Sequence, residues 1–203
     1  MVEDVRASAG GKGNRAVGLL ERAVGALEAD RAIDAERAAA EAKSLAPRSG
    51  AVREVLGLAL YRRGRFREAL RELQAYRRLT GRVDQNHLIA DAHRALGAPE
   101  KAVQTAREAL GPARLPAEAR AEAAVVGGAA LADLGRFEEA LSLLRRVDRG
   151  DRVAREHDLR VWYVIADVLE RSGRRRDAAR AFRRILDHDP RAFDSAERLA
   201  RLS

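Results

Sequence analysis

One short motif recurs along the 203-residue chain at nearly regular intervals. In four copies a glycine is followed five residues later by an alanine: Gly64 to Ala69, Gly97 to Ala102, Gly135 to Ala140 and Gly173 to Ala178. A weaker copy, with aspartate in place of the glycine, runs from Asp30 to Ala35. Successive alanines are 34, 33, 38 and 38 residues apart. A period of this size indicates stacked supersecondary units, each too small to bury its apolar face alone.

Each unit has the pattern of two helices joined by a tight turn. Apolar residues with helical spacing precede the glycines, as in Val55 to Leu60, and glycine favours the left-handed conformation that ends a helix. The segment after the turn usually carries an early acidic residue, which favours a helix N-terminus. Composition agrees, because 42 residues are alanine and 36 are arginine, both good helix formers, and only 4% are aromatic. We therefore expect an all-α fold.

The last complete unit resembles a tetratricopeptide repeat. When it is counted from Leu159, the family's large, apolar, small, large, small, aromatic and proline positions hold Trp162, Ile165, Ala166, Leu169, Ala178, Phe182 and Pro190. The units that begin at Gly50 and Ala121 match well, the unit from Val83 matches more loosely, and the unit from Ala16 matches least. The resemblance implies a right-handed superhelical solenoid of antiparallel helix pairs.

The repeat register divides the chain into segments. We expect a flexible N-terminal leader over 1–15, five repeats over about 16–49, 50–82, 83–117, 121–154 and 159–192, and a C-terminal capping helix over 193–203. A degenerate first unit and a short last one are typical of the ends of a repeat array. The two 38-residue spacings place extra residues at 111–116, expected as a wider corner, and at 149–158, expected as a longer second helix or a charged loop.

Composition excludes several classes of protein. The chain has no cysteine, which excludes disulfide scaffolds, thiolate metal sites and cysteine nucleophiles. Its longest run of small or apolar residues, 123–132, is ten residues long and cannot span a bilayer. The amino terminus lacks the apolar run of a secretory signal, so we expect a cytoplasmic protein without membrane contact. The preference for alanine, and for arginine over lysine, favours a bacterial, GC-rich genome as the source.

The resemblance also implies a protein-interaction surface. In this family the first helices line a concave face that binds peptides or partner helices. The corresponding positions carry acidic, aromatic and small apolar residues: Glu54, Leu58, Tyr61, Arg62, His87, Asp91, Arg94, Val125, Ala129, Tyr163, Asp167 and Arg171. The lysine and asparagine pair with which some relatives clamp a terminal carboxylate is absent. We expect a peptide with apolar anchors and some positive charge, held by Tyr61 and Tyr163; alternatively, both tyrosines only cover neighbouring helices.

The net charge of +8 is concentrated in two blocks. Residues 49–82 carry nine basic and three acidic side chains, net +6, and residues 171–191 carry eight and three, net +5. Arginines at the turns of the second and fifth repeats would form basic edges: Arg63, Arg65, Arg67, Arg174, Arg175 and Arg176. Nucleic-acid binding usually needs a contiguous stripe with aromatic stacking platforms. A basic adaptor for nucleic acid or an acidic partner is therefore the alternative function, and a solvated surface is the simpler interpretation.

No residue pattern indicates catalysis, a metal or a cofactor. His87 and His93 are six residues apart on different faces of a helix, and His157 and His188 are expected at loops or helix ends. The glycines of residues 10–13 lack the full spacing of a phosphate-binding loop. We therefore predict a non-enzymatic scaffold with no cofactor, and a regulatory subunit of an enzyme complex is a more distant alternative. The partner's identity and the oligomeric state stay open.

Overall fold

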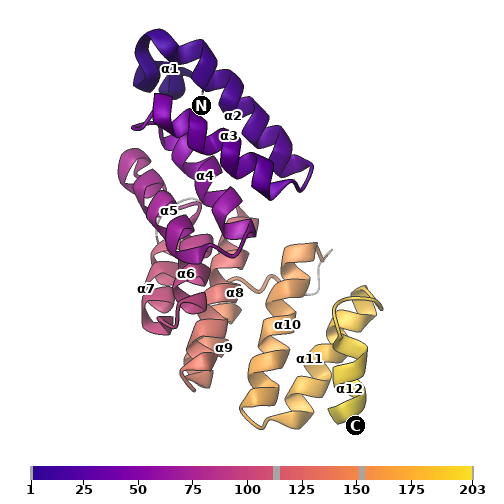
Figure 1. Cartoon of the computed structure of the whole chain (residues 1–203). Coiled ribbons are helices and arrows are strands. Elements are labelled where there is room, and N and C mark those ends of the chain that lie inside the picture. Colours follow the sequence, from indigo (N-terminus) through magenta and orange to yellow (C-terminus); the bar gives the residue numbers. More distant parts are fainter. Residues whose placement is uncertain (1, 112–114, 151–153, 203) are drawn as a thin grey trace. The chain divides into compact units, whose positions relative to one another are not determined.

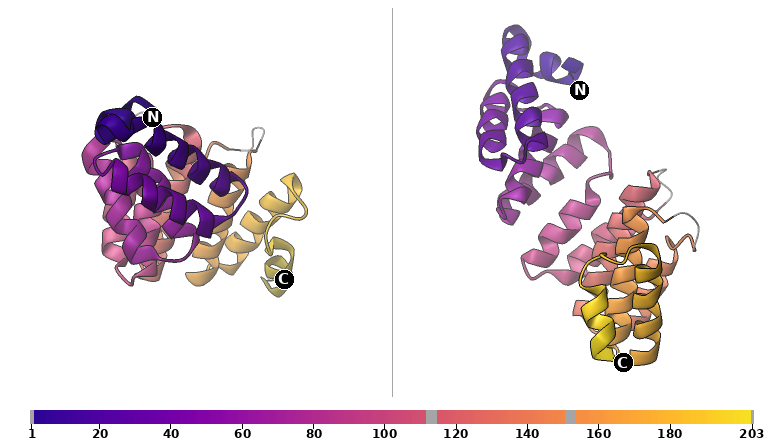
Figure 2. Two further views of the ribbon diagram at one scale, coloured as in Figure 1. Left: turned by 45° about the horizontal axis from the view of Figure 1, so that its top comes forward. Right: turned by 90° about the vertical axis from the view of Figure 1, so that its right-hand side faces the viewer.

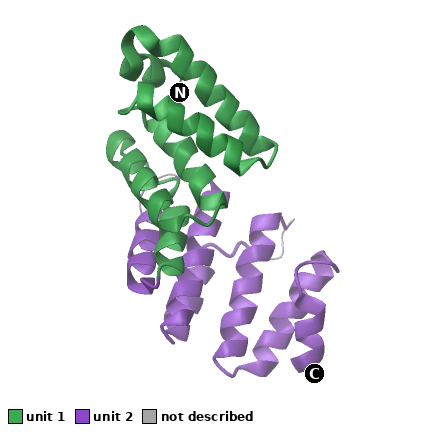
Figure 3. Cartoon of the chain, in the orientation of Figure 1, with its two compact units in different colours: residues 1–96 green, residues 97–203 purple. Residues whose placement is uncertain are grey.

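The computed structural model describes residues 2–111, 115–150 and 154–202. Within these ranges every regular element is a helix and no strand occurs, which confirms the all-α prediction. The chain forms two compact units, residues 1–96 and residues 97–203 (Figure 3). Each unit is described by itself below.

Unit 1 begins with a short helix and continues with longer helices that pack against their sequence neighbours (Figure 1). Helix α2 packs on α3, α3 on α4, α4 on α5, and α5 on α6. The bounds are α1 Val2–Ala9, the 3₁₀ turn η1 Gly10–Lys12, α2 Gly13–Glu28, α3 Ala32–Leu45, α4 Gly50–Arg62, α5 Phe66–Thr80 and α6 Asn86–Ala95.

Unit 2 has the same kind of packing, with α8 in contact with α7, α9 and α10, and α11 between α10 and α12. Figure 2 shows α10 and α11 as an antiparallel hairpin. The bounds are α7 Pro99–Ala109, α8 Ala117–Asp133, α9 Phe137–Arg145, α10 Glu156–Arg171, α11 Arg175–His188 and α12 Ser195–Leu202. Because α9 ends at Arg145, the extra residues at 149–158 do not lengthen the second helix. Residues 112–114 of the expected corner, and residues 151–153, lie outside the described residues.

The turns between paired helices have the predicted left-handed glycines. Gly64, Gly97, Gly135 and Gly173 have φ between 69° and 79°. After α4, the Gly64 N–H donates to Tyr61 O (2.9 Å) and the Arg65 N–H donates to Leu60 O (2.9 Å), which closes the helix. In the weak first copy Asp30 takes the same left-handed position, with φ of 54°. The sequence motif therefore marks a helix end in every copy.

Small residues allow the paired helices to approach closely. The repeat alanines Ala35, Ala69, Ala102, Ala140 and Ala178 are all fully buried. A Cβ added to Gly57 in α4 would lie 2.7 Å from Cγ and Cδ2 of Leu73 in α5, and one added to Gly128 in α8 would lie 2.8 Å from Cγ of Leu144 in α9. These distances are shorter than van der Waals contact, so each helix pair packs more closely than larger side chains would permit.

The amino-terminal segment differs from the flexible leader expected over residues 1–15. Residues 2–9 form α1, which packs on α2 and α4, and its Val5 is fully buried. The Asp4 carboxylate accepts hydrogen bonds from the Ser49 hydroxyl (2.5 Å) and the Ala51 N–H (3.1 Å), so it caps the start of α4. The expectation of a flexible leader was wrong for residues 2–9. This helix is held by one buried valine and one capping carboxylate, and two such residues give no helical periodicity that the sequence could reveal.

Trp162, at the first large signature position of the fifth repeat, is a packing residue that joins α10 to α11 and to the segment after α9. Its Nε1 donates to Oδ1 of Asp148 (2.9 Å), and the Arg184 guanidinium lies 3.8 Å from the centre of its ring. Arg184 also donates to both oxygens of Asp148, at 3.0 and 3.1 Å. Partial burial of Asp148 opposes its ionisation, but these hydrogen bonds hold its pKa below the ordinary value.

We predict that Gly57→Ala lowers the free energy of unfolding by about 1–3 kcal/mol, the usual cost of overpacking a core. The cost of overpacking should therefore be larger than the roughly 1 kcal/mol by which alanine stabilises a helix relative to glycine. Gly18→Ala in α2 is the matched control, because Gly18 is exposed and has nothing within 4 Å of an added Cβ. Chemical denaturation followed by circular dichroism measures both variants. Stabilisation by both would contradict the close approach of α4 and α5.

A second prediction concerns the contact between α1 and α4. Asp4→Ala should lower the free energy of unfolding by about 1 kcal/mol, because the α4 N-terminus loses an ionised cap. Glu3→Ala is the control, since Glu3 is exposed and has no hydrogen bond or ion pair with the described residues. Thermal unfolding compares the two variants. Equal melting temperatures for both would show that α1 does not contribute through Asp4.

Candidate interaction surface

The first helices of successive pairs lie next to one another within each unit. We call the surface formed by α2, α4 and α6 in unit 1, and by α8 and α10 in unit 2, the first-helix face of that unit. Helix α2 contacts α4, and α8 contacts α10. In unit 1 side chains also link α4 to α6: the Tyr61 hydroxyl donates to Oδ2 of Asp91, and Gln85 next to α6 donates to Glu54 (2.8 Å).

The candidate residues of unit 1 lie together on this face. Leu58 is half-buried and Tyr61 packs edge-on against Phe66, with ring centres 5.5 Å apart. Glu54 is partly buried, and this burial, together with the neighbouring charge of Asp84, raises the pKa of its carboxyl, whereas the hydrogen bond from Gln85 lowers it. The face therefore presents a partly exposed leucine and tyrosine beside the carboxylates of Glu54 and Asp91.

The remaining candidates of unit 1 have partners on the same unit. Arg62 donates to the backbone oxygen of Leu27 in α2. His87 Nδ1 lies 3.0 Å from the backbone oxygen of Asp84, and Arg94 lies 3.9 Å from Asp91. The structure thus brings the predicted residues of α4 and α6 together and uses several of them to hold neighbouring helices.

In unit 2 the first-helix face is small and apolar on α8 and charged on α10. Val125 and Ala129 are partly exposed on α8. Arg171 at the end of α10 reaches back to α8, where it donates to the backbone oxygen of Ala132 (2.9 Å) and to Asp133 (3.2 Å). The predicted residues of α8 and α10 therefore lie on two helices that contact each other and share one face.

The candidates Tyr163 and Asp167 contact the C-terminal helix. The Tyr163 hydroxyl donates to Asp194 (2.6 Å), and its ring packs on Phe193, with centres 4.7 Å apart. Arg198 of α12 donates to Asp167 (2.8 Å) and to the Tyr163 oxygen (3.2 Å). The contacts of Tyr163 thus agree with the alternative role given above, in which the tyrosine covers neighbouring helices.

Arg198 in α12 contacts the first-helix face of unit 2, and the sequence did not predict it as a site residue. Besides Asp167 it binds Glu170 at 2.5 Å, and its side chain is only 12% exposed. Its guanidinium also lies 4.9 Å from the centre of the Phe182 ring. The sequence offered one signal, because the repeat register predicted a capping helix over 193–203 that contains this arginine.

The arginines of the two basic edges are mostly held by carboxylates of their own unit. In unit 1, Arg63 and Arg65 both bind Glu36, and Arg65 also binds Glu68 (2.9 Å). In unit 2, Arg174 binds Asp177 (2.8 Å) and Glu138 (3.3 Å), and Arg175 donates to the backbone oxygen of Arg201. Arg67 and Arg176 are exposed, with no ion pair to the described residues. Much of the positive charge in these blocks is therefore balanced locally.

Two further properties bear on function. Within the described ranges, no three histidine, aspartate or glutamate side chains gather where they could hold a metal ion. Nor does any helix of the described chain combine the length and apolar character needed to cross a membrane.

We predict that Arg198→Met destabilises the chain, because Glu170 and Asp167 lose the cation at 2.5 and 2.8 Å, and only Asp167 keeps a more distant one, Arg171 at 3.6 Å. A loss of about 1–3 kcal/mol in the free energy of unfolding is expected for such charge-assisted hydrogen bonds. Arg201→Met on the same helix is the control, since the Arg201 side chain is exposed and makes no ion pair with the described residues. Denaturant titration distinguishes the two, and equal midpoints would refute the role of Arg198.

Comparisons with known proteins agree with the fold of packed helix pairs. Residues 159–202 match the family model of a tetratricopeptide repeat. A search of curated protein sequences gives no significant match. The fold is similar to that of PilW, a type IV pilus biogenesis factor, with a TM-score of 0.76 and 14% identity over 91% of this chain and 86% of that one.

Two further solved structures have the same fold. YrrB, a tetratricopeptide repeat protein with an unusual peptide-binding site, has a TM-score of 0.65 and 17% identity over 90% of both chains. A tetratricopeptide repeat protein of Thermus thermophilus has a TM-score of 0.68 and 19% identity over 92% of this chain and 98% of that one. Residues 159–202 thus match the tetratricopeptide repeat by sequence, and the fold of the chain is similar to that of solved tetratricopeptide repeat proteins.

Proposed function

We propose that the protein is a non-enzymatic scaffold that binds a peptide or a partner helix on its first-helix faces. The observation that carries this proposal is the presence of partly exposed apolar side chains on those faces, Leu58 in unit 1 and Val125 and Ala129 in unit 2, beside polar side chains. Apolar side chains with a charged rim are the usual composition of a groove that takes apolar anchors. The fold supports a protein partner in general, since tetratricopeptide repeats are protein-binding modules.

The bonds within each face support a pre-organised surface. Tyr61 is held by Asp91, and Arg171 is held by α8, so these side chains have little freedom to lose when a partner binds. Pre-organisation lowers the entropic cost of association and leaves more of the contact energy as affinity. The same bonds already satisfy Asp91 and Asp167, so the partner's apolar side chains would contribute more than its positive charge.

The residues of unit 1 give the clearest division of roles. In our proposal Leu58 and Tyr61 receive apolar groups, while Glu54, His87 and Arg94 form the polar rim that orients the peptide. YrrB, which shares the fold, is itself named for a peptide-binding site. This likeness supports a peptide as the ligand class and does not identify the peptide.

The nucleic-acid alternative has less support. Arg63, Arg65 and Arg174 are paired with carboxylates, so releasing them to bind phosphate would leave Glu36 without a cation and would remove one of the two cations of Asp177. The two exposed arginines without an ion pair to the described residues, Arg67 and Arg176, belong to different units. Phe66 and Phe182, the aromatic residues nearest the two edges in sequence, pack against tyrosines. The edges thus lack the exposed stacking platforms that single-stranded nucleic acid needs.

We predict that Leu58→Glu weakens partner binding by about tenfold or more, as expected when a central apolar anchor becomes charged. Leu79→Glu is the matched control, because Leu79 is an exposed leucine on second helix α5 of the same unit. A photo-crosslinking residue placed at either position in the full chain, followed by mass spectrometry, identifies what each face touches. Crosslinks from position 79 alone, or nucleic acid as the main species from position 58, would contradict the proposal.

A further inference from the structure

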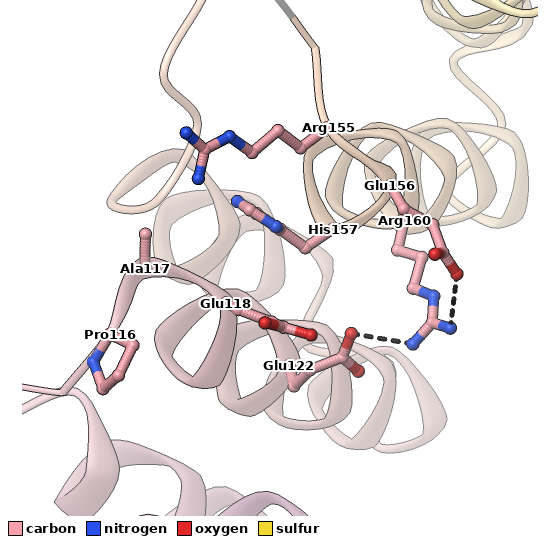
Figure 4. A pocket seen from close by; sticks show the side chains of 8 residues that line it. All are labelled: Pro116, Ala117, Glu118, Glu122, Arg155, Glu156, His157 and Arg160. Carbon is pink, nitrogen blue, oxygen red and sulfur yellow. Dashed lines mark hydrogen bonds and ion pairs between the residues drawn. The ribbon is translucent and has the colours of Figure 1, made fainter.

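A small pocket lies in unit 2 at the amino-terminal ends of α8 and α10 (Figure 4). Its volume is about 320 Å³, which is at the lower end of the range of small-molecule sites, about 300–1,000 Å³. Ionisable side chains from both helices dominate its lining: Glu118, Glu122, Arg155, Glu156, His157 and Arg160. The pocket therefore has the size and polarity of a site for a small charged molecule.

His157 supplies the observation that points to a ligand. It lies in the first turn of α10, at a helix end as the sequence predicted, and is only 9% exposed. Its Nε2 is buried and has no hydrogen-bond partner among the described residues; Oδ1 of Asp158, at 3.7 Å, is too distant. Figure 4 shows the imidazole pointing into the pocket. A buried polar atom without a partner is unfavourable, and a bound polar group would remove that cost.

The charges around the imidazole divide into a balanced set and an unbalanced pair. Arg160 donates to Glu122 (2.8 Å) and to Glu156 (2.9 Å), so these groups satisfy one another. Arg155 and Glu118 have no ion pair with the described residues. In Figure 4 the Arg155 guanidinium lies on one side of the imidazole and the Glu118 carboxylate on the other. The pocket thus offers a cation and an anion on opposite sides of an unpartnered nitrogen.

We propose that this pocket binds a small zwitterion of the α-amino acid or dipeptide class. The ligand's carboxylate would bind Arg155, its ammonium group would bind Glu118, and a polar atom between them would bond His157 Nε2. A simple anion would be repelled by Glu118 and a simple cation by Arg155, so a ligand with both charges fits best. This inference concerns a small molecule and does not depend on the proposed protein partner.

Titration of the full chain with L-alanyl-L-alanine, followed by calorimetry, tests the proposal. The dipeptide should bind saturably at millimolar concentration or below. N-acetyl-L-alanyl-L-alanine lacks the ammonium group and L-alanyl-L-alanine amide lacks the carboxylate, so each should bind about tenfold more weakly, as expected for the loss of one charge-assisted contact. Failure of both the dipeptide and free L-alanine to bind, or equal binding by the blocked derivatives, would overturn the inference.

Variants of the two exposed charged residues localise the binding. Arg155→Gln and Glu118→Gln should each weaken dipeptide binding by about tenfold. Arg176→Gln, at an exposed arginine of the same unit, is the control and should bind like the parent chain. The double variant Arg155→Glu with Glu118→Arg exchanges the charges and should bind more tightly than either single variant. Parent-like binding by both single variants would place the ligand elsewhere and overturn the assignment.

Discussion

The close approach of paired helices at small residues is the constraint on which the rest of the structure depends. Leu73 of α5 and Leu144 of α9 occupy the space that side chains at Gly57 and Gly128 would need. The alanine of each repeat is fully buried for the same reason. Dispersion attraction between helices falls off steeply with their separation. The close contact at the small residues therefore determines how the two helices of each pair pack and which side of the first helix stays exposed.

Charge is organised by the same packing. The turns bring arginines such as Arg65 and Arg174 next to acidic residues of the preceding helix pair and of their own second helix, so they bind Glu36 and Asp177. At the carboxyl end, Arg198 serves the acidic groups of α10 while α12 covers α11. Exposed ion pairs of this kind contribute little stability individually, but they change what the surface offers to a partner. A chain with a net charge of +8 consequently presents edges whose arginines are mostly engaged.

The candidate residues are covered to different extents in the two units. In unit 1 Leu58 is only partly buried, whereas in unit 2 Tyr163 already packs on Phe193. The pocket beside His157 lies at the amino-terminal end of α10, next to Arg155, and Tyr163 comes later in the same helix. One helix therefore serves three purposes along its length: a polar pocket, a packing face and a contact with the C-terminal cap.

The sequence by itself determined the repeat, the helix ends at the glycines and the buried small residues, because these follow from local backbone conformation and a period of about 34 residues. It also indicated which first-helix positions are candidates for binding. Only the tertiary structure decided that α1 packs on α4, that Arg198 neutralises Asp167, and that His157 Nε2 is buried without a partner. These features depend on contacts between residues far apart in sequence, and no local pattern specifies such a contact. A charge or a histidine has the same letter whether it is solvated, paired or buried, so its role is set by the neighbours that folding brings to it.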